Sequence, residues 1–131
     1  MQPVAQVASG GEIARLMLSL KALISGAVKL PTIIFDEIDT GVSGKIAEQM
    51  AAIMHEMGDA NRQVISITHL PQIAAVGTHQ YKVEKYEEDG RTISVMRKLT
   101  NEERIDEIAQ MLSGADITEA ARTNAKVLLK L

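Results

Sequence analysis

Three short segments of this 131-residue chain combine residue types that could bind and cleave a phosphate ester. Asp36 and Glu37 directly follow an apolar, β-branched run, so both carboxylates are expected at the end of a buried strand. A carboxylate there can hold Mg²⁺, and its neighbour can orient an attacking water. His69 ends a second such run, and Ser9 begins a Ser-Gly-Gly-Glu segment whose backbone N–H groups could meet an anion.

Each segment taken alone also has an ordinary structural interpretation. A strand can end in two solvated acids, and Ser9 followed by two glycines can be a simple N-cap. His69 alone would more often be a hydrogen-bonded structural histidine. The functional interpretation therefore depends on the three segments meeting in space.

The elements between these segments predict that they do meet. Apolar residues recur at helical spacing over 11–28 and over 46–57, and short β-prone runs cover 32–35 and 64–68. Two strands separated by a helix predict a parallel sheet, with Ser43 as the N-cap of the intervening helix. Because ligands bind at the carboxyl ends of parallel strands, Asp36, Glu37 and His69 should converge on one edge.

The rest of the chain has a different pattern. Two β-prone runs, 81–86 and 92–98, flank an acidic stretch with a glycine and predict an antiparallel hairpin with a solvated tip over 84–89. A capping box at Thr100 opens a helix that should end at Gly114, and a last helix is expected over about 118–131. No repeat or linker is visible, so a single domain over 1–131 is predicted.

Composition narrows the classes of function. The 14 Lys and Arg are outnumbered by 17 Asp and Glu, and three aromatic residues make up the whole set, so a domain that holds nucleic acid by itself is not expected. No cysteine is present, which excludes disulfides and thiolate sites. Neither a membrane-spanning run nor a signal peptide is visible, so no membrane partner and a cytoplasmic location are expected.

The order of the motifs resembles that of an ABC ATPase. Residues 7–12 (VASGGE) resemble the signature motif, 33–37 the Walker B strand with its glutamate, 39–41 the D-loop, and His69 the switch histidine. The longer segments IIFDEIDTGVSG and ITHLPQIAA are similar to those of the RecN family, SMC-like ABC ATPases of bacterial double-strand break repair. The segments 104–112 and 124–126 also resemble the carboxy terminus of that family, so the resemblance covers nearly the whole chain.

The resemblance implies a fold class, two cofactors and a set of site residues. The fold is an α/β half-domain of the P-loop NTPase, ABC type, with a parallel sheet, flanking helices and a C-terminal antiparallel hairpin. Glu37 and His69 would be catalytic, and Asp36 would serve Mg²⁺. The residues implied to bind ATP or the second head are Ser9, Gly10 and Gly11 at the γ-phosphate, Glu12 of the same motif, and Asp39 across the head dimer.

One motif of the family is missing from these residues. No G-x-x-x-x-G-K-[ST] sequence occurs in the chain, so the resemblance implies a carboxy-terminal lobe that supplies half of a composite ATP site. Its partners would be the amino-terminal lobe of the same head, a second head in a homodimer, and nucleoid DNA through the full-length protein. ATPase activity is expected only in that full-length dimer. The alternative is a stand-alone, non-hydrolysing binding or scaffolding module.

Overall fold

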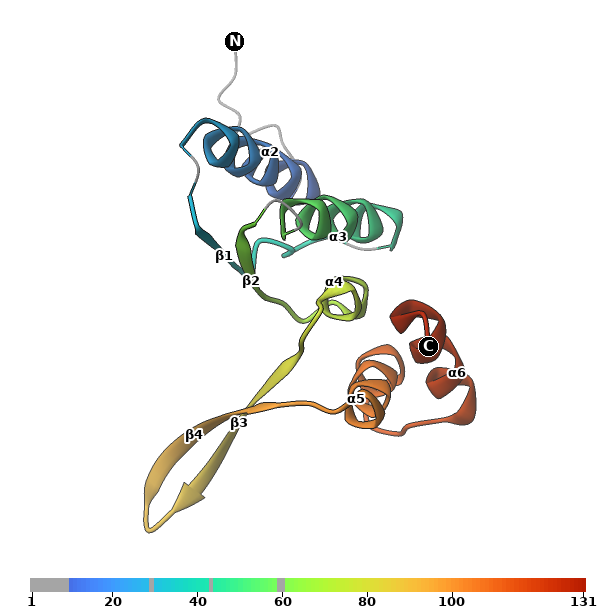
Figure 1. Ribbon diagram of the computed structural model, residues 1–131. Helices are drawn as coiled ribbons and strands as arrows, with labels where there is room; N and C mark the ends of the chain where they lie inside the picture. Colours follow the sequence, from blue (N-terminus) through green and yellow to red (C-terminus); the bar gives the residue numbers. More distant parts are fainter. Residues whose placement is uncertain (1–9, 29, 43, 59–60) are drawn as a thin grey trace. The chain divides into compact units, whose positions relative to one another are not determined.

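A computed structural model describes residues 10–28, 30–42, 44–58 and 61–131 of the chain (Figure 1). The chain forms two compact units, residues 1–76 and residues 77–131. The first unit alternates helices and parallel strands, and the second consists of an antiparallel hairpin followed by two helices. The predicted α/β class with a parallel sheet, flanking helices and a C-terminal hairpin is thereby confirmed.

The first unit is built around a two-stranded parallel sheet. Its elements in chain order are α2 (Gly10–Val28), β1 (Thr32–Asp36), α3 (Gly44–Gly58), β2 (Gln63–Ile67) and α4 (Pro71–Val76). In the ladder Thr32 lies opposite Gln63, and Asp36 lies opposite Ile67. The predicted strand–helix–strand unit is confirmed, and Ser43 lies outside the described residues.

Helix α4 was not expected from the sequence. It begins at Pro71, a residue suited to the first helical position because its ring presets the backbone angle and its missing N–H would have no helical partner there. The buried side chains of Pro71, Ile73 and Ala75 anchor this short helix. With only six residues, α4 is too short to show a helical period in the sequence.

One face of the sheet packs on the helices. Strand β1 alternates, with Ile33 and Phe35 buried and their neighbours exposed. The core cluster joins this face to both long helices, which Figure 1 shows on the same side of the strands. Its most deeply buried members are Leu18 of α2, Phe35 of β1, and Ala47, Met50 and Ala51 of α3.

The opposite face of the sheet is apolar and open. Ile34 pairs in register with Ile65, and both side chains lie on this face, where they are 53% and 40% exposed. Ile67 extends the same row and is 49% exposed. The three isoleucines thus form an exposed apolar row on this face of the strand pair.

The second unit contains β3 (Tyr81–Glu88), β4 (Arg91–Lys98), α5 (Asn101–Ser113) and α6 (Glu119–Leu129). The hairpin is longer than predicted: the strands pair up to Glu88 and Arg91, and only two residues form the turn. Asp89 and Gly90 have φ angles of 50° and 71°, the left-handed conformation of a two-residue hairpin turn that follows strand twist. The acids of the predicted tip are therefore mostly strand residues.

The two helices of the second unit begin as their sequences predict. At Thr100 the capping box is complete, since its hydroxyl accepts the Glu103 N–H at 3.3 Å and the Glu103 carboxylate accepts the Thr100 N–H at 3.1 Å. Thr118 caps α6 by accepting the Ala121 N–H at 3.1 Å. Helix α5 ends at Gly114, with a φ of 79°. Helices α5 and α6 pack through Ile105, Ile108, Ala109, Ala121 and Ala125.

Candidate phosphate-handling site

Two of the predicted acids lie where β1 ends. Asp36 is its last residue and Glu37 the next, and both side chains are exposed. The backbone N–H of Glu37 donates to the Ile67 carbonyl oxygen at 2.9 Å, which continues the β1–β2 ladder one residue beyond the strand. The end of β1 is thus fixed to the end of β2, and His69 follows two residues later.

The backbone at Glu37 is strained. Its φ is 48°, in the left-handed region that non-glycine residues seldom occupy. The Thr40 hydroxyl donates to the Glu37 carbonyl oxygen at 3.1 Å, and the Val42 N–H donates to the Asp39 carbonyl oxygen at 3.1 Å. A short hydrogen-bonded loop therefore fixes Glu37 in this conformation, and such outliers gather at functional sites.

Asp39 lies inside the first unit instead of on its surface. Its side chain is 1% exposed, and its Oδ2 accepts a hydrogen bond from the Thr68 hydroxyl. The Thr68 hydroxyl in turn accepts the Leu70 N–H at 3.0 Å, and His69 Nδ1 lies 3.8 Å from Asp39 Oδ1. The loop after β1 and the loop after β2 are thus joined by side chains. Thr68 received no role from the sequence, although its hydroxyl next to His69 was a visible signal.

The signature segment is only partly described. Gly10 and Gly11 form the first turn of α2, Glu12 follows there with an exposed side chain, and Ser9 lies outside the described residues. A 19-residue helix that begins at the two glycines agrees with the prediction that they open a helix. Its amino end offers backbone N–H groups to an anion, as any long helix does.

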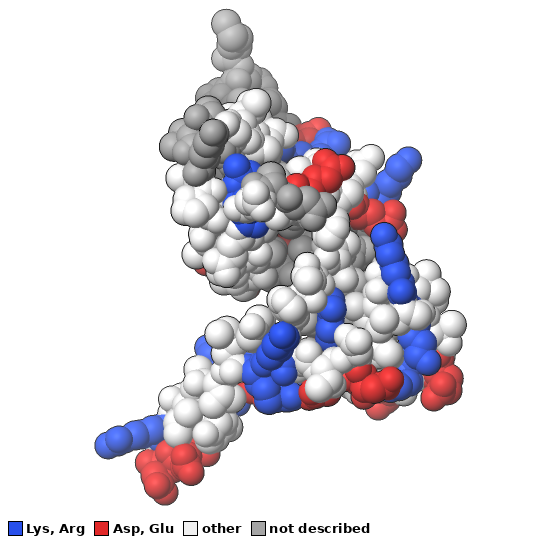
Figure 2. Space-filling model, viewed as in Figure 1, with Lys and Arg blue, Asp and Glu red and all other residues white. Residues whose placement is uncertain are grey.

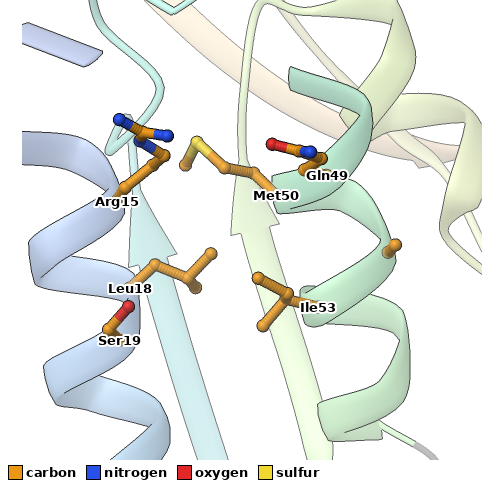
Figure 3. A pocket seen from close by; sticks show the side chains of 7 residues that line it. Arg15, Leu18, Ser19, Gln49, Met50 and Ile53 are labelled. Atoms are coloured by element: carbon orange, nitrogen blue, oxygen red, sulfur yellow. The ribbon is translucent and has the colours of Figure 1, made fainter. Parts of the chain in front are cut away.

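A groove between α2 and α3 contains none of the predicted site residues. It has a volume of about 350 Å³ and is lined by Arg15, Leu18, Ser19, Gln49, Met50, Ala52 and Ile53. In Figure 3 the side chains of Leu18 and Ile53 point toward one another across it, and Arg15 and Gln49 lie toward one end. The groove is largely apolar and offers little that would fix a phosphate.

Two basic residues of the hairpin, Lys82 and Arg97, form ion pairs with acids of the same unit. Lys82 Nζ lies 2.7 Å from Glu107 and 3.7 Å from Glu84, and the hydrogen bond to Glu107 raises the pKa of Lys82. Arg97 pairs with Glu103. Figure 2 shows basic and acidic groups interspersed over the visible face. The charges of Lys82 and Arg97 are thus partly balanced within the unit itself.

In the described part of the chain, no group of three or more His, Asp or Glu side chains is gathered tightly enough to enclose a metal ion. None of its helices combines the length and the apolar character needed to cross a bilayer. The exposed carboxylate of Asp36 nevertheless suits Mg²⁺, because this ion keeps several waters and takes one or two carboxylates together with substrate phosphates.

The chain is similar to known proteins over nearly its whole length. No protein-family model matches the chain. It is 42% identical over 130 residues to the DNA repair protein RecN of Haemophilus influenzae and 47% identical over 127 residues to that of Deinococcus radiodurans, which covers 99% and 97% of the chain. This chain is a RecN-like segment. Bacillus subtilis RecN is 42% identical over 131 residues.

The RecN-like chain spans 22–23% of the length of these relatives. A solved structure, described as concerning ATP-driven dimerization and DNA-stimulated activation of SMC ATPases, has the same fold. The TM-score is 0.66 at 22% identity, and the match covers 85% of this chain and 65% of that one. The ABC-type α/β half-domain expected from the RecN resemblance is thereby confirmed.

Proposed function

We propose that this chain is the carboxy-terminal lobe of an ATP-hydrolysing head of a DNA double-strand break repair protein, acting at the bacterial nucleoid. The observation that carries the proposal is the junction of β1 and β2. Asp36 and Glu37 leave one strand, His69 follows the other, and the hydrogen bond from Glu37 to Ile67 fixes the two exits side by side. Parallel strands place ligands at this edge.

Within this proposal each exposed side chain has a separate task. Asp36 would hold Mg²⁺, which supplies charge neutralisation on the phosphates when bound. Glu37 would orient the attacking water and accept its proton, a role that needs a carboxylate in hydrogen-bond reach. His69, with a side chain 64% exposed, would donate to the γ-phosphate. Ser9, Gly10 and Gly11 would meet a γ-phosphate carried by a second head.

The open face of the sheet supports the proposed partner lobe. Ile34, Ile65 and Ile67 form an apolar row, and within the described residues β1 and β2 pair only with one another. The apolar row calls for a cover, and the sheet can accept further strands at its edges. An amino-terminal lobe with the Walker A loop would supply both and complete the nucleotide site.

The decisive experiment is Glu37→Gln in the full-length protein. The exchange keeps the shape of the side chain and removes the charge that orients water, so ATP binding and head association should persist while turnover falls at least about 100-fold. Glu48→Gln, the same chemical change on the exposed side of α3, is the matched control and should hydrolyse ATP normally. Normal turnover in Glu37→Gln would contradict the catalytic role.

The isolated chain provides a second test of the half-site. It lacks the Walker A loop and lysine, so calorimetric titration should show neither tight ATP binding nor hydrolysis. Micromolar affinity in this chain alone would contradict a site shared between lobes. A full-length protein that repairs DNA without any ATPase activity would instead favour the non-hydrolysing scaffold.

A further inference from the structure

Asp39 is the only buried charged side chain among the described residues. One of its two oxygens, Oδ2, accepts the Thr68 hydroxyl proton. The other, Oδ1, is buried and has no hydrogen-bond donor in the described part of the chain. Leaving a buried carboxylate oxygen without a donor is costly, so this atom is expected to have a partner in the working protein.

A side chain that could serve is the imidazole of His69. Its Nδ1 lies 3.8 Å from Asp39 Oδ1, which is too long for a hydrogen bond but within reach of a small rotation of the ring. The ring is free to make that rotation, since the side chain is 64% exposed. The carboxylate cannot move as easily, because it is buried and fixed through Thr68.

Thr68 makes this arrangement rigid. Its hydroxyl donates its single proton to Asp39 Oδ2 and accepts the Leu70 N–H at 3.0 Å, so both of its roles are in use. The hydroxyl therefore cannot turn to serve Oδ1. The remaining carboxylate oxygen faces His69 with its acceptor capacity unused.

We propose that Asp39 is a positioning residue for His69: its Oδ1 accepts the Nδ1–H of the imidazole and thereby directs Nε2 outward. The hydrogen bond on one ring nitrogen decides which atom the other presents to a ligand. When Nε2 donates to a phosphate oxygen, the ring carries both protons and the buried carboxylate balances that charge. The phosphate part rests on the proposed function, but the Asp39–His69 pair does not.

This inference gives Asp39 a task in its own chain. The family resemblance alone places Asp39 in a contact across two heads, whereas here the carboxylate is engaged with the loop after β2. The pair would couple the loop that holds Glu37 to the loop that holds His69. A displacement of one loop would then alter the position of the other.

The test is a nitrogen NMR spectrum of the ¹⁵N-labelled 131-residue chain. Two-bond proton–nitrogen spectra between about pH 6 and pH 9 report which ring nitrogen of each histidine carries the proton, over both protonation states of an ordinary histidine. His55 and His79 are exposed and serve as internal references. An unrestrained neutral imidazole favours the Nε2–H form, so His69 alone should show the Nδ1–H pattern.

Variants separate positioning from simple support of the fold. Asp39→Asn keeps the shape and removes the charge, and it should shift His69 toward the pattern of His55 and His79 while the amide spectrum of β1 and β2 persists. Thr68→Ser keeps the hydroxyl and should retain the Nδ1–H pattern, whereas Thr68→Val should weaken it. A native His69 spectrum that matches the two reference histidines would overturn the proposal without any variant having to fold.

The outcome is independent of ATP hydrolysis. If the Nδ1–H pattern is found but Glu37→Gln hydrolyses ATP normally in the full-length protein, the proposed function fails and the Asp39–His69 pair stands. If turnover depends on Glu37 but His69 shows the reference pattern, the pair fails and the proposed function stands.

Discussion

The backbone N–H of Glu37 donates to the carbonyl oxygen of Ile67 at 2.9 Å, one residue past the end of β1. This bond places the loop after β1 against the exit of β2. The Thr68–Asp39 hydrogen bond makes a second connection, two residues further along the first loop and one residue further along the second. The two loops are thus joined at two points. A site that needs a carboxylate and a histidine at a fixed separation gains its geometry from these two bonds.

Phe35 and Ile34 are neighbours on β1 that face opposite sides, and they provide a matched pair for stability. Phe35 is fully buried in the core cluster, so Phe35→Ala should cost about 3–5 kcal/mol through lost burial and the cavity left behind. Ile34→Ala removes a side chain that is 53% exposed and should cost below about 1 kcal/mol. Urea denaturation of the chain measures both; equal losses would contradict the assignment of the two faces.

Gly90 and Gly26 should respond in opposite ways to the same change. Neither glycine has an atom within 4 Å of an added Cβ, but Gly90 has a φ of +71°, which strains any side chain. Gly90→Ala should therefore destabilise the hairpin by about 1 kcal/mol. Gly26→Ala, within α2, should stabilise by about 0.5–1 kcal/mol. Thermal denaturation decides, and a stabilising Gly90→Ala would contradict the two-residue turn.

Glu103 should make the stability of the second unit depend on pH in the acidic range. The hydrogen bond from Arg97 holds the pKa of Glu103 below its ordinary value of 4.5. A carboxyl whose folded pKa is lowered contributes stability above its unfolded pKa and loses it as the pH falls through the folded pKa. Carboxyl carbon NMR should show Glu103 titrating below pH 4.5, and Arg97→Gln should move that titration upward. An unchanged titration would show that the ion pair is absent in solution.

Ser9 tests whether the phosphate site is shared between two heads. In the full-length protein, Ser9→Arg should leave ATP loading nearly intact and block hydrolysis, because the helix end would no longer fit a phosphate on the other head. A Ser9→Arg subunit mixed with a Walker A mutant subunit should regain partial ATPase activity, since one intact interface is rebuilt. Mixed dimers that form but stay inactive would contradict the role in trans.

The sequence predicted the helices and strands that are marked by a clear local pattern of residues. Apolar periodicity located α2 and α3, β-branched runs located β1 and β2, and the capping box at Thr100 located the start of α5. The carboxyl-end rule for parallel strands then placed Glu37 and His69 near one another. Helix α4 escaped because its six residues are too few for a period.

The burial of the Asp39 side chain could not be predicted from the neighbouring residues in the sequence. Asp39 follows an exposed Glu37 by two residues in a polar loop, and a carboxylate there is ordinarily solvated. Its burial depends on a hydroxyl 29 residues away in the chain, at Thr68. Such a contact becomes visible only when β1 and β2 are paired in register, so the sequence alone did not indicate the burial of Asp39.

At Glu37, the residue that best suits the backbone differs from the residue that the proposed chemistry needs. For the turn alone, glycine would fit this φ at no steric cost, and a glutamate there raises the free energy of the native state. Glu37→Gly should therefore yield a more heat-resistant but inert protein. An engineer who ranks variants of this chain by melting temperature alone would discard the residue on which the proposed hydrolysis depends.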